Sequence, residues 1–284
     1  MGGSARYGAR PASGVAGRAL GATAVAGVLL GGVLGCGSRA DVGESAASEE
    51  VAELLVSIDE EVAEGASLTA DQVEASGPGA PEVALVQEND GQLRAASTED
   101  GTPALRFPLH TAGKAPVAIL ALSSADPDWL QPRDGDLVFG ADLAVDAVSD
   151  GTDRDNGDNV VQRGLFGAPA QFKLQVDHRR PSCLVRGDAG TVLAKSSVTV
   201  EPRSWYRVTC RRTGDEVEVT VSRLEGGTEV DTAVDREQGH IGSVSFPSEA
   251  VVSIGGKLGP EGGPVEDATD QYDGSLSRIH VSVE

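Results

Sequence analysis

A ten-residue stretch from Asp150 to Asn159 has the residue types that bind a hard cation. It combines two glycines with six acidic or amide side chains, which are Asp150, Asp153, Asp155, Asn156, Asp158 and Asn159. Calcium takes six to eight oxygen ligands from flexible loops, so Asp153, Asp155 and Asp158 are candidate calcium ligands. The stretch is not an EF-hand loop, because Gly157 would stand where that loop needs its third oxygen ligand. The alternative is a polar turn, solvated between two strands.

No set of catalytic residues is recognisable elsewhere. The four histidines, at positions 110, 178, 240 and 280, are scattered, and His280 alternates with Ile279 and Val281 as an exposed strand residue would. No paired-histidine metal motif and no nucleophile elbow occurs. Gly255-Gly256-Lys257 lacks the upstream glycine and the following Ser or Thr of a phosphate-binding loop. The sequence therefore predicts a protein that is not an enzyme.

The N-terminus has the layout of a secretory signal peptide over residues 1–35. Three arginines and no acid precede an uncharged apolar run from Ala19 to Gly35. This run is at the short end of the ~17–25 residues that cross a membrane. It ends in Val33-Leu34-Gly35-Cys36, which resembles the lipobox of bacterial lipoproteins. The resemblance implies that Cys36 becomes the new N-terminus and carries a lipid. An ordinary signal peptide or a signal anchor is the alternative.

The two other cysteines are Cys183 and Cys210. Export to an oxidising compartment permits a disulfide, and an even pair in a secreted domain is usually bridged. Cys183 begins an alternating strand and Cys210 ends one, so we expect them to face each other across adjacent strands. Two free buried thiols are the alternative.

The chain is strongly acidic, with 44 Asp and Glu, 23 Lys and Arg, and a formal net charge of −21. Such a chain is repelled by phosphate backbones, which excludes non-specific nucleic-acid binding. Much of the charge lies in residues 36–98, whose low hydrophobicity predicts a mostly disordered spacer. Within it, apolar residues at helical spacing predict a short helix over 48–64, capped by Ser48; they are Val51, Leu54, Leu55, Ile58 and Val62. This helix would either dock on a partner or stay solvated.

Residues 99–284 are predicted to form an all-β domain. Apolar residues alternate with others over 137–145, 172–176, 217–221 and 279–283, and turn clusters such as Asn156-Gly157 separate the runs. Many short strands of this kind indicate an antiparallel sandwich. The length exceeds the ~100 residues of an immunoglobulin module and suits a larger two-sheet jelly roll.

The order of several short motifs resembles the laminin-G-like domains of the concanavalin A-like lectin/glucanase superfamily. The motifs are Ser204-Trp205-Tyr206-Arg207-Val208, Gly214-Asp215, Ile254-Gly255-Gly256 and Gly274-Ser275-Leu276-Ser277-Arg278-Ile279. The resemblance implies a jelly roll that binds a glycan or a protein, with calcium in many members and glycan hydrolysis in others. The hydrolases' paired glutamates are not reproduced, since Glu229-Val230-Asp231 lacks the second glutamate. Trp205 matches a core strand tryptophan, and Trp129 is the better candidate for an exposed aromatic.

Together these observations predict a cell-surface, lipid-anchored binding module that recognises a glycan or an extracellular protein. It would be exported, held at the outer face of the membrane through Cys36 or released, and bridged between Cys183 and Cys210. Two alternatives stay open. One is a glycan hydrolase with an unrecognised active site, and the other is a structural envelope protein without a specific ligand.

Overall fold

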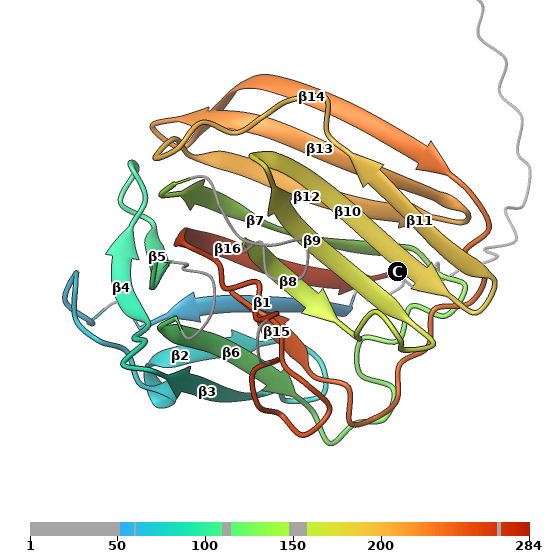
Figure 1. Ribbon diagram of the computed structural model, residues 1–284, viewed down its shortest axis with the longest axis horizontal. Helices are drawn as coiled ribbons and strands as arrows, with labels where there is room; N and C mark the ends of the chain where they lie inside the picture. The colour runs from blue at the N-terminus through green and yellow to red at the C-terminus, as the bar shows by residue number, and fades with distance from the viewer. Residues whose placement is uncertain (1–51, 60, 110–114, 148–157, 266–267) are drawn as a thin grey trace, which may run out of the picture. The chain divides into compact units, whose positions relative to one another are not determined.

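The computed structural model describes residues 52–59, 61–109, 115–147, 158–265 and 268–284. Within these ranges the chain is nearly all β, with one short 3-10 helix at Ala70–Gln72. No helix of the described residues is long and apolar enough to cross a membrane. The strands form two antiparallel sheets that face each other, with β8–β11 in front of β12–β14 and β16 in Figure 1.

The larger sheet has nine strands in the order β14-β13-β12-β7-β16-β1-β2, and β5 joins it by pairing with both β16 and β4. Its strands are β1 (Ala52–Ile58), β2 (Val73–Ser76), β4 (Arg94–Ser97), β5 (Pro103–Phe107), β7 (Leu137–Val145), β12 (Tyr206–Thr213), β13 (Glu216–Glu225), β14 (Thr228–Gln238) and β16 (Gly274–Val283).

The smaller sheet has seven strands in the order β11-β10-β9-β8-β15-β6-β3. They are β3 (Glu82–Glu88), β6 (Val117–Ser123), β8 (Asn159–Arg163), β9 (Gln171–Asp177), β10 (Arg180–Gly187), β11 (Gly190–Lys195) and β15 (Val252–Ile254). The predicted all-β, antiparallel two-sheet sandwich is thus confirmed.

The core lies between the two sheets and is built from alternate residues of their strands. Phe139 of β7 and Phe172 of β9 meet across it with ring centroids 4.8 Å apart, and Phe246 packs edge-on against Phe172. The four alternating runs of the sequence lie in β7, β9, β13 and β16, as expected. Because one face of each strand is buried, the other face of the larger sheet is free to carry polar side chains.

The predicted spacer over 36–98 is wrong from Ala52 onward, and so is the predicted helix over 48–64. Residues 52–97 supply β1 to β4, which belong to both sheets, so the sandwich does not begin at residue 99. Leu54, Val56 and Ile58 are buried on one face of β1, so the true period is two. The sequence also fits a helix, because Ile58 follows Leu55 by three residues and Leu54 by four, which is the spacing of one helical face. The rest of the predicted spacer lies outside the described residues.

The disulfide between Cys183 and Cys210 is confirmed, but its position is not the expected one. Cys183 belongs to β10 of the smaller sheet and Cys210 to β12 of the larger sheet, with 5.6 Å between the two Cα atoms. Both cysteines are fully buried. The bond therefore joins the two sheets through the core, because both side chains point inward, and does not link adjacent strands.

Candidate functional site

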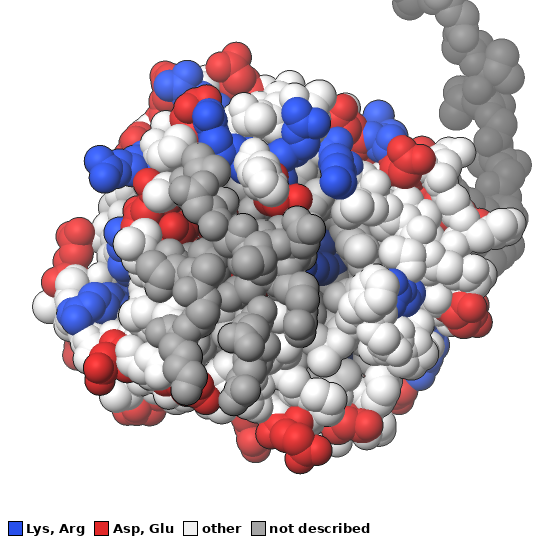
Figure 2. Space-filling model, viewed as in Figure 1, with Lys and Arg blue, Asp and Glu red and all other residues white. Residues whose placement is uncertain are grey.

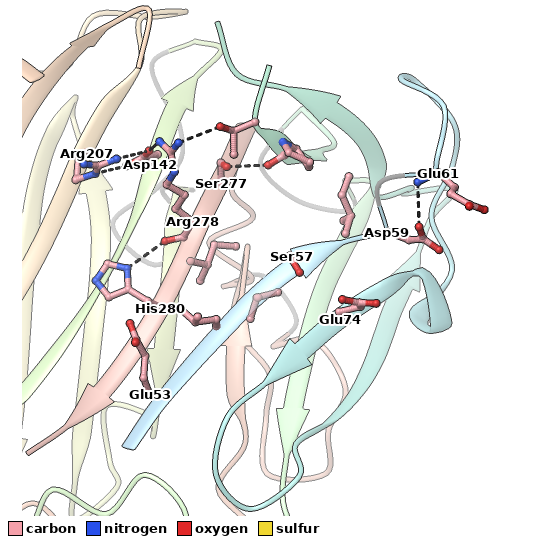
Figure 3. Close-up of a pocket in the computed structure, with 16 residues that line it drawn as sticks. Glu53, Ser57, Asp59, Glu61, Glu74, Asp142, Arg207, Ser277, Arg278 and His280 are labelled. Atoms are coloured by element: carbon pink, nitrogen blue, oxygen red, sulfur yellow. Dashed lines mark hydrogen bonds and ion pairs between the residues drawn. The ribbon is translucent and has the colours of Figure 1, made fainter. Parts of the chain in front are cut away.

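A groove of about 1030 Å³ lies in the outer face of the larger sheet. We call it the sheet groove. Residues from β1, β2, β7, β12 and β16 line it, together with Thr102 and Pro103 at the start of β5 (Figure 3). The alternation of β1 explains its contribution: Leu54, Val56 and Ile58 point into the core, so the residues between them face the groove.

A β-bulge in β16 sets the middle of the sheet groove. The register against β7 shifts between Ser277, which pairs with Asp142, and His280, which pairs with Gly140. Arg278 lies in the bulge with a left-handed backbone, φ 47°. A bulge inserts an extra residue and redirects the side chains around it. Ser277 and Arg278 thus both line the groove, although they are consecutive in the strand.

Asp142 is the centre of an ion network at one side of the sheet groove. It is only 1% exposed, and both of its oxygens are bound by arginines. Arg207 donates from Nε to Oδ1 at 2.8 Å and from Nη2 to Oδ2 at 3.0 Å. Arg278 donates from Nη1 to Oδ2 at 2.9 Å. These hydrogen bonds to Asp142 raise the pKa of both arginines above the ordinary value, so each guanidinium stays charged.

Two further carboxylates occupy the same arginines. Arg207 Nη1 donates to Glu229 Oε1 at 2.8 Å, and Arg278 Nη2 lies 3.3 Å from Asp100 Oδ2. Hydrogen bonds from Thr98 and Thr102 hold the pKa of Asp100 well below its usual range, with a smaller contribution from Arg278. Two positive charges are therefore shared by three negative ones. The network is rigid, and it offers little attraction to an incoming anion.

The opposite side of the sheet groove is acidic. Asp59, Glu61 and Glu74 line it, and Figure 3 shows Asp59 and Glu74 across the groove from Asp142 and Arg207. A fourth acid, Glu53, lines the groove below His280 in the same view. Among the described lining residues, the only basic side chains are the two arginines of the network and His280. With the arginines already neutralised, the groove as a whole is negative.

His280 lies against the sheet and is half-buried, in contrast to the exposed position that the sequence suggested. Its Nδ1 is 3.0 Å from the carbonyl oxygen of Arg278. Gly140 lies beneath the ring, since a Cβ there would come within 3.0 Å of His280 Cε1 and 2.4 Å of the Val208 oxygen. The absence of a side chain at Gly140 therefore lets the imidazole form part of the groove wall.

Among the described residues, no Phe, Tyr or Trp side chain lines the sheet groove. Trp205 is buried against Ala104, Ala144 and Leu224, as predicted for a core residue. Trp129, expected to be the exposed aromatic, is only 2% exposed. It is covered because the guanidinium of Arg163 stacks on its ring at 5.0 Å. Among the described residues, Phe166 is an exposed aromatic, at 84%, and it lies outside the groove.

The candidate calcium ligands are only partly visible. Asp153 and Asp155 lie outside the described residues, and so does the candidate lipidation site, Cys36. Asp158 is buried and shares a hydrogen bond with Asp273, whose pKa burial raises to about 6. Within the described ranges no group of three His, Cys, Asp or Glu residues is arranged to hold a metal ion. Calcium binding stays a prediction.

The sequence offered no direct signal for the groove residues. Asp142 is separated by 65 residues from Arg207 and by 136 from Arg278, and only the strand order brings them together. The one available hint was Asp142 itself, a carboxylate in an otherwise apolar strand. Glu229, the nearest match to a catalytic glutamate, is held by Arg207 at the edge of the sheet.

No family model and no curated protein matches this chain. Its fold resembles a protein of unknown function from Shewanella oneidensis MR-1, with 9% identity, TM-score 0.45, and coverage of 81% of this chain and 87% of that one. It also resembles the binding domain of Paraclostridial Mosquitocidal Protein 1, with 8% identity and TM-score 0.49 over 78% of this chain and 48% of that one. A third likeness is to the LG1-3 region of the laminin alpha2 chain, with 9% identity and TM-score 0.34 over 81% and 61%.

This chain thus spans about half the length of the mosquitocidal binding domain. Likenesses at 8–9% identity concern the fold alone, and no functional residue is carried over from them. The properties of the site follow from the shape of the sheet groove and from the charges that line it. Its chemistry is that of a rigid, hydrogen-bonding, negatively charged surface on a sheet whose other face is the core.

Proposed function

We propose that this protein is a non-catalytic binding module whose ligand lies in the sheet groove. The observation that carries the proposal is the groove itself, about 1030 Å³ in the polar outer face of a nine-stranded antiparallel sheet. Ligand sites are concave and largely preformed. Here most of the polar groups come from strands, the exceptions being Asp59, Glu61 and Thr102, so the ligand meets groups whose positions are largely set by the sheet.

The charge of the sheet groove selects the class of ligand. Four acids besides Asp142 line the groove, which are Glu53, Asp59, Glu61 and Glu74, and its two arginines are neutralised by Asp142, Glu229 and Asp100. Sulfated or uronic-acid glycans would meet like charge at close range, which is unfavourable. The proposed ligand is therefore a neutral glycan or a basic segment of an extracellular protein.

The state of Asp142 supports a non-catalytic role. An acid catalyst or nucleophile must have an oxygen free for the substrate, and a retaining glycosidase needs two carboxylates about 5–5.5 Å apart. Both oxygens of Asp142 are engaged by arginines, and Glu229 is engaged by Arg207. These carboxylates act as fixed anchors for the arginines.

The proposal includes attachment of the module to the outer face of the membrane by a lipid on Cys36. The support is the sequence Val33-Leu34-Gly35-Cys36 after an apolar run. Residues 37–51 then separate the lipid from β1. The groove would face material outside the cell.

The test is binding of the full chain to neutral polysaccharides, to sulfated and uronic-acid polysaccharides, and to a lysine-rich peptide, by affinity electrophoresis and calorimetry. Ser57→Trp fills the groove from β1, and Thr220→Trp makes the same change on β13 of the same sheet, outside the groove. We expect a neutral glycan or the basic peptide to bind, Ser57→Trp to abolish binding, and Thr220→Trp to retain it. Release of sugar fragments, or binding unaffected by Ser57→Trp, would contradict the proposal.

A further inference from the structure

A second, smaller pocket of about 250 Å³ lies on the outer face of the smaller sheet. We call it the loop pocket. Its floor is formed by β8 and β15, and its walls are formed by residues 164–168, 247–251 and 258–262. Most of the wall is apolar, with contributions from Leu165, Pro247, Ala250, Val251, Leu258 and Pro260. The loop pocket shares no residue with the sheet groove.

The floor of the loop pocket holds a buried amide. Gln162 lines the pocket and is 2% exposed. Its Nε2 donates to the carbonyl oxygen of Gly164 at 2.7 Å, which sets the orientation of the amide. Its Oε1 is buried and accepts a hydrogen bond from none of the described residues. Buried acceptors are usually paired, because an unpaired one loses its hydrogen bonds to water without replacement.

One wall of the loop pocket is held in place by a buried arginine behind it. Arg163 Nε donates to the carbonyl oxygen of Ala250 at 2.9 Å. Its guanidinium lies between the rings of Trp129 and Phe246, at 5.0 and 4.6 Å from their centroids. Burial lowers the pKa of Arg163 to about 10, so the side chain stays charged at neutral pH. The wall at Ala250 is therefore fixed before any ligand arrives.

The lining carries almost no charge. Glu249, an exposed residue, is its single ionisable side chain among the described residues. In Figure 2 the charged side chains of this face lie mainly along its upper part and rim, and the surface towards the lower right is mostly uncharged. An ion would have to leave water for apolar walls without a partner, whereas an uncharged molecule would not.

We propose that the loop pocket binds a small uncharged molecule with a hydroxyl group on an apolar ring or chain. The apolar body fills the space between the leucine and proline side chains, and the hydroxyl donates to Gln162 Oε1. A donor is required because Oε1 can only accept a hydrogen bond. This site is independent of the sheet groove and of the ligand proposed for it.

The test uses two ring compounds of similar shape, cyclohexanol and methoxycyclohexane, titrated into the full chain by calorimetry and ligand-observed NMR. We expect cyclohexanol to bind at least about tenfold more tightly, because the ether has no donor for the buried oxygen. In Gln162→Met the two compounds should bind alike. In Ala168→Phe, which fills the pocket from its wall, neither should bind.

Gln171→Met is the matched control. Gln171 is also buried and also donates to the Gly164 oxygen, at 3.3 Å, but it does not line the pocket. This variant should keep the preference for the alcohol. Equal binding of alcohol and ether by the unaltered protein, no binding of either, or the same loss in Gln171→Met as in Gln162→Met would overturn the proposal.

Discussion

At the level of single residues, the structure of the sheet groove depends on carboxylates that accept hydrogen bonds from protein groups and are not simply solvated. Asp142 is the clearest case, since a side chain 1% exposed accepts three hydrogen bonds from two arginines. The charge remains buried because both partners are positive and one of them binds it with two nitrogens.

Asp142→Asn should therefore destabilise the protein. The amide keeps the volume but loses the charge, and hydrogen bonds to charged groups contribute about 1.5–3 kcal/mol each at most. We expect the free energy of unfolding in urea to fall by about 2 kcal/mol. Asp128→Asn is the control, because Asp128 pairs with Arg133 on the exposed surface. It should change stability by less than about 0.5 kcal/mol. Equal effects of the two substitutions would contradict the network described here.

Asp100 provides a pH-dependent test of the same network. Its folded-state pKa lies below that of the unfolded chain, mainly because Thr98 and Thr102 donate hydrogen bonds to it. Such a group stabilises the fold above the unfolded pKa, near 3.9, and the stabilisation is lost as the pH falls through the folded pKa.

Asp100→Asn should thus be less stable than the unaltered protein at pH 7, by about 1 kcal/mol, and the difference should shrink below pH 4. Urea unfolding at pH 7, 5 and 3 measures it. Asp90→Asn, at an exposed turn position, is the control and should show no such trend. A constant difference between Asp100→Asn and the unaltered protein at all three pH values would show that the carboxylate charge is not responsible.

At the scale of elements, β1 is the strand whose sequence was most misleading. Its buried residues Leu54, Val56 and Ile58 follow period two, but the exposed Leu55 interrupts the alternation, and the strand stands in a long acidic, aromatic-free segment. The acidic composition of the segment therefore indicated a spacer more strongly than its short alternating pattern indicated a strand. By contrast, β7, β9, β13 and β16 were predictable because their apolar residues alternate over five or more positions without ambiguity.

Other features required the three-dimensional arrangement. The pairing of Cys183 with Cys210 followed from their number and the export signal, but their placement on opposite sheets did not. The sheet groove was not predictable, because it depends on the register of β16 against β7. It also depends on a bulge in β16 that has no recognisable signal in the local sequence. The burial of Trp129 was not predictable either, because Arg163, which stacks on its ring, belongs to β8 and is distant in the sequence.

The structure predicts where the folded unit begins. β1 pairs with β16 and β2 in the interior of the larger sheet, so its removal would expose both neighbouring strands and part of the core. A chain starting at Ser48 should fold cooperatively, whereas a chain starting at Glu99 should aggregate or unfold. Circular dichroism and thermal melting of the two truncations distinguish them. A stable, cooperative 99–284 fragment would restore the spacer interpretation of residues 52–98.

At the scale of the whole molecule, the chain combines a predicted export signal with a β-sandwich that has recesses on the outer faces of both sheets. The strong negative charge suits a protein that stays soluble and avoids nucleic acid and other anionic polymers. These features agree with the proposed role, which is to bind uncharged or cationic material outside the cell.

The lipid anchor is tested by Cys36→Ser in a bacterial host. We expect the unaltered protein to partition with membranes and into detergent, and the variant to be released in soluble form, because the thiol is the site of the lipid. Mass spectrometry of the mature N-terminus provides the direct readout. Identical solubility and the same cleavage position in both proteins would rule the lipobox out.

The proposed function requires that the ligand binds to the outer face of the larger sheet. The most direct measurement is amide chemical-shift mapping of the folded unit during titration with neutral oligosaccharides and with a lysine-rich peptide. We expect the amide shifts that a bound ligand causes to concentrate in β1 and around the bulge of β16, from Ser277 to His280. Shifts confined to the smaller sheet, or no shifts with either class of ligand, would contradict it.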